Sequence, residues 1–548
     1  MASTGRRRKI AIYGGSFNPI TDAHLTMMAA IIHSRAADEV WVLPCGERPD
    51  KPTLKSAGED RSLMCHLAIE STFTGTFPIK ICPIEYINGG TAYQTVDLFF
   101  AHPDPETHAK YPTLHEFTRF SDDAKETSAW LRRGSSTAPH EFVFACGSDL
   151  LESMPTWSPT RGNWYEQMGF VVFPRPGSRI PESWIARENV RVLGLAVEST
   201  PSVFCDSNLS SSEIRRRIAG QLAMSGSSKG ALKARLGNYM YLAEGMLPQA
   251  VIKFILSAGL LHDDADGDAE VGGDGAAAAV APPLMMRQHS TDYEVQITPV
   301  PAGAPHVARR IGVLGGSFDP ITFGHLKIAA EAIHSQVVDE VWVVPCGARP
   351  DKPSLRRSFN DRWLMCSLAV NHTFSHDFGV KVVDVERPSA TVPRAMQTYE
   401  LLALLTAKHP SKEFYFIAGT DLLPSMPTWS SAELKATVPL AVDWFRRFSF
   451  IVKNRPGYEL PVEGGWWSDT PAEGSAVNRN IHLMSSGAAR WGGEVISTEM
   501  SSSLLRSQLD FAQPGLVALE GGEDVMLKIE ALCPLPVVSF IRRYRHYH

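Results

Sequence analysis

The sequence predicts an α/β protein built from two copies of one doubly wound domain, in which helices cover both faces of a parallel sheet. Two observations predict this class. Short apolar runs, rich in β-branched and aromatic residues, alternate with stretches whose apolar residues recur at helical spacing. The same succession of runs occurs twice within the 548 residues. Each copy is long enough to bury a hydrophobic core of its own.

Two gap-free alignments establish the repeat. Residues 10–54 match 311–355 at an offset of 301, and residues 141–158 match 413–430 at an offset of 272. The offset falls because the first copy carries an additional segment of about 29 residues, which we place near 101–140 and expect to be a surface loop. The predicted domains are therefore residues 1–261 and 309–548.

Residues 262–308 lie between the two copies and differ from them in composition. They are acidic at first and then rich in Ala, Gly and Pro, with no apolar period that could be buried. We expect a flexible linker, and an acidic docking segment is the alternative. Such a linker would also allow the two domains to pair with each other within one chain.

Charge and cysteine content argue against several classes of protein. The 53 Lys and Arg residues stand against 59 Asp and Glu, so the net charge of −6 provides no basic field for nucleic acid or anionic lipid. No run of 18 apolar residues occurs that could span a membrane. The eight cysteines form no CxxC pair, which favours reduced, buried thiols in a cytoplasmic protein without nucleic-acid or membrane partners. The basic run Arg6–Lys9 leaves a nuclear location as the alternative.

Strands are expected in the first copy wherever a short apolar run is bounded by turn residues. Helical spacing occurs between these runs, as in Leu25, Met28 and Ile32, and again in Leu63 and Leu67. Parallel strands that alternate with helices place the ligand site outside the carboxyl ends of the strands. The six expected strands are Ile10–Tyr13, Val40–Leu43, Ile79–Ile84, Phe142–Cys146, Phe170–Phe173 and Val190–Ala196.

The turn after the first strand has the composition of an anion-binding site. Gly14 and Gly15 allow positive φ and a close approach of a ligand to the main chain. A helix that begins after Thr21 presents free N–H groups, and His24 follows Thr21 by three residues on its first turn. The turn has neither the GK[ST] ending of a Walker loop nor a GxGxxG fingerprint. GGSFNPITDAH returns as GGSFDPITFGH, so the second copy repeats the turn in full.

Five ordered motifs make the chain similar to a known family. They are GGSFNPITDAH, PCGxRPDKP, an Asp-Arg pair, GSDLL…MPTW and SSSEIR, and each has a counterpart in the second copy. With these motifs each copy resembles the nicotinamide/nicotinate mononucleotide adenylyltransferases, in the nucleotidyltransferase superfamily with the (T/H)xxH signature. The resemblance implies two Rossmann-like nucleotidyltransferase domains. It covers both copies except the linker and the insertion.

The resemblance implies adenylyl transfer in NAD biosynthesis. The 5′-phosphate of nicotinamide or nicotinate mononucleotide would attack the α-phosphorus of ATP, and pyrophosphate would leave. His24 and His325 would donate to the phosphate oxygens during catalysis, and Arg215 and Arg506 would clamp the β- and γ-phosphates. Mg²⁺ would be held mainly by phosphate oxygens and water, so no cage of protein metal ligands is expected.

The resemblance also implies binding residues in both copies. For the mononucleotide, the threonine of each set would hydrogen-bond the pyridine substituent, the lysine would add a mobile cation near the phosphates, and the tryptophan would stack on the pyridine ring or pack nearby. These sets are Lys51, Thr95 and Trp157, and Lys352, Thr398 and Trp429. The implied ATP-binding residues are Gly15, Ser16, Phe17, Thr21, Gly147, Asp149, Ser211 and Ser212, and in the second copy Gly316, Ser317, Phe318, Thr322, Gly419, Asp421, Ser502 and Ser503. The Asp60-Arg61 pair would contact substrate or form an ion pair that holds the preceding loop.

Two other functions stay open beside NAD formation. A related nucleotidyltransferase would act on another phosphorylated acceptor, such as a pantetheine or choline phosphate, although the MPTW segment and the length of each copy argue against this. One copy could instead be a silent binding module. Both copies keep Thr-x-x-His and Ser-Ser-Ser-x-x-Arg, which favours two active sites.

Overall fold

The computed structural model describes most of both repeats. By their contacts, the described residues form two compact units. Unit 1 contains the described residues up to 258 together with 539–544, and unit 2 contains those from 309 to 538. The predicted linker at 262–308 lies outside the described residues, which are 7–46, 57–87, 94–117, 140–158, 161–175, 178–193, 214, 247–258, 309–349, 355, 357–374, 378–389, 395–430, 432–453, 466, 481–484 and 532–544.

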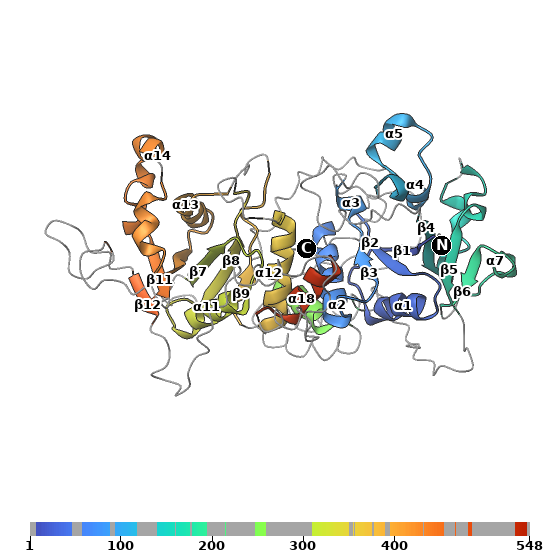
Figure 1. The fold of residues 1–548 in the computed structure, drawn as a ribbon, viewed down its shortest axis with the longest axis horizontal. Helices are drawn as coiled ribbons and strands as arrows, with labels where there is room; N and C mark the ends of the chain where they lie inside the picture. The colour runs from blue at the N-terminus through green and yellow to red at the C-terminus, as the bar shows by residue number, and fades with distance from the viewer. Residues whose placement is uncertain are drawn as a thin grey trace, which may run out of the picture. The chain divides into compact units, whose positions relative to one another are not determined.

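Unit 1 contains a parallel sheet of six strands in the order β3-β2-β1-β4-β5-β6 (Figure 1). The chain builds the sheet outward from β1 in one direction and then from β4 in the other. The carboxyl ends of β1 and β4 therefore mark the topological switch point, where doubly wound sheets bind ligands. This confirms the predicted Rossmann-like class. The strands are β1 (Lys9–Gly15), β2 (Glu39–Pro44), β3 (Ile79–Ile81), β4 (Glu141–Gly147), β5 (Gly169–Phe173) and β6 (Val190–Val192).

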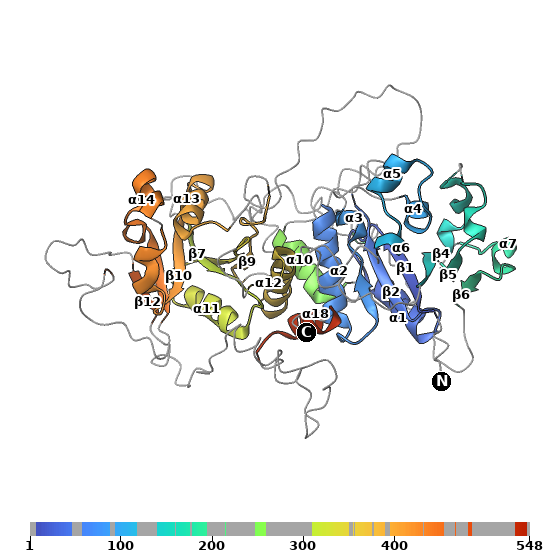
Figure 2. The same cartoon turned by 45° about the horizontal axis from the view of Figure 1, so that its top comes forward.

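The helices of unit 1 cover the sheet with apolar faces. Leu25, Met28 and Ile31 are the buried residues of α1 (Asp22–His33), which begins after the N-cap Thr21. Figure 2 shows α10 (Gln249–Ala258) beside α2 (Gly58–Thr72), with which it is in contact. The shorter helices are α3 (Ile84–Ile87), α4 (Thr95–Phe99), α5 (Pro105–Lys110), α6 (Leu114–Phe117) and α7 (Glu182–Ile185), with the 3₁₀ turns η3 (Ser148–Leu150), η4 (Met154–Thr156) and η6 (Trp164–Glu166).

Part of the insertion is helical, so the prediction of a loop throughout 101–140 is wrong for residues 105–110 and 114–117. Asp104 caps α5 by accepting a hydrogen bond from the N–H of Thr107 at 2.9 Å, and Pro105 occupies the first helical position. Leu114 and Phe117 of α6 are buried. β3 also ends earlier than predicted, at Ile81, two residues before a proline that has no N–H to donate to a sheet.

Unit 2 repeats the topology, with the strand order β12-β11-β10-β7-β8-β9. Its switch point lies at the carboxyl ends of β7 and β10. The strands are β7 (Arg309–Gly316), β8 (Glu340–Pro345), β9 (Val380–Val382), β10 (Lys412–Gly419), β11 (Ser449–Lys453) and β12 (Ile481–Met484). The helices are α11 (Phe323–His334), α12 (Phe359–Thr373), α13 (Thr398–Lys408) and α14 (Ala432–Thr437), with the 3₁₀ turns η8 (Leu423–Thr428), η9 (Pro439–Ala441) and η10 (Trp444–Arg446). A further helix, α18 (Leu535–Arg543), begins in unit 2, and its residues from 539 on belong to unit 1.

The cysteines of the described residues are buried and form no disulfide, as predicted. Burial raises the pKa of the Cys65, Cys146 and Cys366 thiols, so these groups are small core side chains rather than nucleophiles. Among the described residues, no helix combines the length and apolar character that a bilayer crossing requires. The seven free cysteines in the described ranges are Cys45, Cys65, Cys82, Cys146, Cys346, Cys366 and Cys533.

Candidate functional site

The predicted phosphate turn and the GSD motif lie at neighbouring strand ends. In unit 1, β1 pairs with β4, and Tyr13 lies opposite Ala145 close to the carboxyl ends of the two strands. The Gly14-Gly15 turn and residues 147–149 therefore meet at the switch point. In unit 2, β7 pairs with β10 in the same way, which brings the second turn close to Gly419 and Asp421. The structure thus joins motifs that are about 130 residues apart in the first copy.

The ring of Phe17 packs against Gly15 of the turn. The φ of Phe17 is 45°, in the left-handed region that is costly for an aromatic residue. A Cβ atom at Gly15 would lie 3.0 Å from Cζ of the Phe17 ring, so glycine lets the ring pack there. The Phe17 side chain is 2% exposed, and any contact of this residue with ATP would use its main chain. Phe318 repeats the φ of 45° and is equally buried.

His24 is oriented by Thr21, which is fully buried. The main-chain N–H of Thr21 donates to Nδ1 of His24 at 3.0 Å, and Oγ1 of Thr21 lies 2.7 Å from the same nitrogen. The edge of the Phe17 ring packs on the imidazole, with 5.3 Å between ring centroids. Because Nδ1 accepts the N–H of Thr21, the proton of the neutral ring is on Nε2. His24 therefore carries an oriented N–H donor at the switch point.

His325 in unit 2 has the same environment. The N–H of Thr322 donates to Nδ1 of His325 at 3.0 Å, and Oγ1 of Thr322 lies 2.8 Å from that nitrogen. The ring centroids of Phe318 and His325 are 5.1 Å apart. The three-residue spacing of Thr-x-x-His is sufficient for this geometry, since a helix N-cap and the third helical residue share one face of the first turn.

The surroundings of His24 keep its ring uncharged. Burial, and secondly the positive charge of Arg175, lower the pKa of His24 to about 3. The ring is therefore neutral at physiological pH. It can stabilise developing negative charge as a hydrogen-bond donor, without gaining or losing a proton.

Arg175 is a cation of the site that the sequence reasoning missed. It follows β5, and its Nε lies 3.3 Å from Oδ1 of Asp149. A Cβ atom at Gly147 would come within 2.6 Å of the Nε of Arg175 and closer still to Asp149, so glycine at this strand end permits the pair. The Arg175 and Asp149 side chains are 37% and 43% exposed, so both reach solvent. The repetition of Arg-Pro-Gly at 175–177 and 455–457 was the available signal.

Trp157 and Trp429 each pack against a second tryptophan. Trp157 lies 6.2 Å from Trp164 with 19° between the ring planes, and Trp429 lies 5.7 Å from Trp444 with 24°. Trp164 and Trp444 are buried, whereas Trp157 and Trp429 are half-buried. The inner tryptophans therefore support the outer ones from the core side. Stacking of the outer rings on a pyridine stays a prediction.

The other predicted residues lie at helix starts or outside the described residues. Thr95 and Thr398 are the half-buried first residues of α4 and α13, and their contacts with a mononucleotide stay predictions. Roles for the residues outside the described part of the chain also stay predictions. Those residues are Lys51, Lys352, Ser211, Ser212, Arg215, Ser502, Ser503 and Arg506.

Arg61, from the Asp-Arg motif, positions the phosphate turn. It lies in the first turn of α2 and is 1% exposed. Its Nη1 donates to the main-chain oxygen of Ser16 at 2.9 Å. Its Nη2 donates to the oxygen of Gly46 at 3.0 Å. In unit 2, Arg362 donates likewise to the oxygen of Ser317 at 2.7 Å. These bonds join α2 and α12 to the main chain of the turns. The substrate contact and the ion pair expected for the Asp60-Arg61 motif stay predictions.

Within the described ranges, no group of three or more His, Cys, Asp and Glu side chains is arranged to hold a metal ion. The groups at the switch point are instead N–H donors and a guanidinium, which suit an anion. Mg²⁺ takes oxygen ligands, and it commonly obtains most of them from water and substrate phosphates.

The chain is similar to known proteins. The profile of the family described as cytidylyltransferase-like matches residues 12–217 and 313–505. A protein of Halalkalibacterium halodurans described as a probable nicotinate-nucleotide adenylyltransferase is 39% identical over 154 residues, or 28% of this chain and 67% of the relative. One of Bacillus cytotoxicus with the same description is 34% identical over 153 residues, or 28% of this chain and 72% of the relative. A structure of Plasmodium falciparum nicotinic acid mononucleotide adenylyltransferase complexed with NaAD is 21% identical, with a TM-score of 0.31 over 44% of this chain and 97% of that one.

Proposed function

The chain belongs to the cytidylyltransferase-like family, and on this premise we propose that each unit transfers the adenylyl group of ATP to nicotinate mononucleotide. The products are deamido-NAD and pyrophosphate. Two relatives that are matched over at least two thirds of their length are described by this activity. The structural observation that supports the proposal best is the oriented histidine, because the N–H to Nδ1 bond of 3.0 Å occurs in both units.

The protein needs to form no covalent bond with the substrates in this reaction. An oxygen of the mononucleotide 5′-phosphate bonds to the α-phosphorus of ATP, the bond to the bridging oxygen breaks, and that electron pair leaves with pyrophosphate. Negative charge grows on the phosphate oxygens. The Nε2–H of His24 would donate to these oxygens, and the N-terminus of α1 and the Arg175 guanidinium would add positive potential. A neutral, fixed donor is sufficient for this role.

We propose that Mg²⁺ enters as the counter-ion of ATP. The donors at the switch point suit phosphate oxygens, and the carboxylate of Asp149 is paired with Arg175. When bound, the ion would neutralise part of the polyphosphate charge. The domain boundaries, a cytoplasmic location and the absence of a nucleic-acid partner stay predictions.

The choice of acceptor tests the proposed function. The full chain would be incubated with ATP and nicotinate mononucleotide, and pyrophosphate release and dinucleotide formation would be measured. We expect turnover with nicotinate mononucleotide to exceed that with nicotinamide mononucleotide. Pantetheine phosphate and choline phosphate should give no release above ATP alone. Turnover with either of these, and none with a pyridine mononucleotide, would overturn the proposal.

Because the pKa of His24 is low, we predict that the pH dependence of the rate shows no ionisation from this histidine. With unit 2 silenced by His325→Ala, kcat/KM for ATP should show no ionisation of His24 between about pH 5 and pH 8, because the ring of the free enzyme stays neutral above a pKa of about 3. An imidazolium donor would make kcat/KM fall as the pH rises through about 6.5. The control is His24→Gln, which keeps an N–H donor and cannot titrate. A limb present with histidine and absent with glutamine contradicts the neutral donor.

Arg175→Met is expected to weaken use of ATP by unit 1. A hydrogen bond from a charged group contributes about 1.5–3 kcal/mol, so kcat/KM for ATP should fall roughly 10- to 100-fold in the His325→Ala background. Arg175→Lys should recover part of the loss, since it restores the charge without the fork. Arg179→Met is the matched control, an exposed arginine four residues on. Equal effects of Arg175→Met and Arg179→Met would remove Arg175 from the site.

A further inference from the structure

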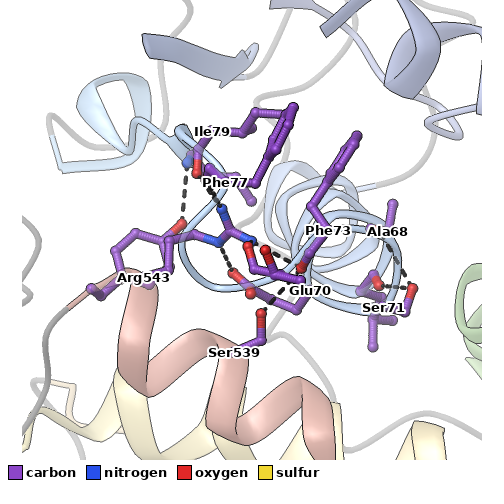
Figure 3. Close-up of polar contacts among 12 residues, drawn as sticks. Ala68, Glu70, Ser71, Phe73, Phe77, Ile79, Ser539 and Arg543 are labelled. Carbon is purple, nitrogen blue, oxygen red and sulfur yellow. Dashed lines mark hydrogen bonds and ion pairs between the residues drawn. The ribbon is translucent and has the colours of Figure 1, made fainter. Parts of the chain in front are cut away.

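Residues 539–544, hereafter the 539–544 segment, belong to unit 1 by their contacts although they follow the second repeat in sequence. The segment comprises the last turns of α18 and Tyr544. It lies against α2, the following residues 73–79 and β3 (Figures 1 and 3). We call this surface of unit 1 the seat.

Arg543 is the centre of the contact (Figure 3). Its Nε donates to Oε1 of Glu70 at 2.8 Å, and the two side chains are 1% and 0% exposed. The other four N–H groups of the guanidinium donate to main-chain oxygens of Phe73, Thr74, Phe77 and Ile79, at 2.7 to 3.2 Å. All five donors of the arginine are therefore used. A buried charge with this complete a set of partners is compatible with the interior of a folded unit.

The segment also caps the edge of the sheet. β3 is an edge strand, and Pro78 and Cys82 supply groups that bond to β2. Because bonding alternates along a parallel strand, the main-chain groups of Ile79 and Ile81 face away from β2. The oxygen of Ile79 accepts from Arg543, and the N–H of Ile81 donates to Oη of Tyr544 at 3.1 Å. Side chains of the segment thus satisfy polar groups that an open edge would leave exposed.

The shapes of the two surfaces also fit. A Cβ atom at Gly75 would lie 2.6 Å from the main-chain oxygen of Ser539, so any larger residue would push the segment away. The His66 ring packs against both Phe540 and Tyr544, with centroids 5.7 and 5.9 Å away. Hydrogen bonds, close main-chain packing and aromatic contacts therefore all occur where the 539–544 segment meets the seat.

Residues of the seat that contact the 539–544 segment are replaced by other residue types in the second repeat. At the offset of 301, Glu70 corresponds to Asn371, His66 to Ser367 and Gly75 to His376. If Pro248 is aligned with Pro534, the counterpart of Arg543 after the first repeat is Ser257. Neither the carboxylate nor the arginine has an equivalent, so duplication alone does not account for this ion pair.

We infer that the 539–544 segment is a structural part of unit 1, and that it holds α2 and the edge of the sheet in the arrangement that supports the first nucleotide site. α2 carries Glu70 near one end and Arg61 at the other, roughly 13 Å apart for nine residues of helix. Arg61 bonds to the main chain of the phosphate turn. One helix therefore connects the seat with the site.

Hydrogen exchange of the full-length protein tests this inference without reference to catalysis. Arg543→Met removes the charge and the five donors but keeps the apolar stem. Arg179→Met is the matched control, because this arginine of unit 1 is exposed and lies outside the seat. We expect amides of residues 66–82 to exchange about tenfold faster or more in Arg543→Met, while α12 of unit 2 keeps its rates. Unchanged exchange over 66–82 would overturn the inference.

A milder variant covers the case in which Arg543→Met does not fold. Tyr544→Phe removes only the hydroxyl that accepts the N–H of Ile81. The amide of Ile81 should exchange faster in this variant and not in Arg179→Met. An Ile81 amide with an unchanged rate counts against the seat.

The segment that fills the seat is expected to come from the same chain. Exchange over 66–82 should then be independent of protein concentration across about a hundredfold range. Protection that is lost on dilution would mean that a second copy supplies the segment, and would reject the intramolecular arrangement.

Discussion

Alanine at both His24 and His325 is expected to abolish adenylyl transfer, with kcat at each site lowered about 10²- to 10³-fold or more. The reason is the loss of an oriented Nε2–H donor at each switch point. Either single substitution should leave the other unit working, so the single variants keep a substantial part of the turnover. Steady-state turnover of the full chain with ATP and nicotinate mononucleotide measures this directly.

The control for these variants is the histidine at the other end of the same helix. His33 is exposed in the last turn of α1 and packs against Phe77 at 5.8 Å, away from the phosphate turn. His33→Ala should retain turnover. Persisting turnover in the double variant would show that the histidines have been assigned wrongly. Complete loss in one single variant would identify the other unit as a silent module.

Arg61→Met is expected to destabilise unit 1 by about 3 kcal/mol, because it leaves the part-buried carbonyl of Ser16 and the buried carbonyl of Gly46 without their donor. The phosphate turn should also lose its position, and KM for ATP should rise in the His325→Ala background. Denaturant unfolding followed by hydrogen exchange would report the free energy of unfolding for each unit separately.

Two variants make the Arg61 result specific. Arg61→Lys keeps the charge but cannot donate to two carbonyls from one planar group, so we expect it to recover little. Arg362→Met should transfer the damage to unit 2, where Arg362 bonds to Ser317. If Arg61→Met and Arg362→Met affected the same unit, the positioning role would be refuted.

The strands and the phosphate turns could be predicted because they depend on short stretches of sequence. A buried parallel strand is a run of apolar residues, and the Thr21–His24 geometry follows from one helix start. Because the repeat occurs twice, each pattern could be compared between the two copies. Where the order of strands places two motifs together, as with Gly15 and Gly147, the doubly wound class was sufficient to predict it.

Contacts between distant side chains could not be predicted in this way. The pairing of Arg175 with Asp149 depends on how two loops approach each other, and the role of Arg61 depends on where the turns lie above α2. The Glu70 and Arg543 side chains are 473 residues apart. A helical pattern shows which face of a helix is apolar, but not which surface will cover it. The capping residues of the insertion helices could be recognised in the sequence. The polar composition around them nevertheless led to the prediction of a loop.

The separation of Glu70 and Arg543 has a consequence for synthesis on the ribosome. At 5 to 20 residues per second, translation of the intervening 473 residues takes roughly 24 to 95 s. Throughout that time the nascent first half has its Glu70 carboxylate and its outermost strand uncovered, and an uncovered strand edge recruits other chains. A cell that makes this protein would therefore need to shield the emerging half, by a chaperone or by slow polysome loading, until the stretch that carries Arg543 has been translated.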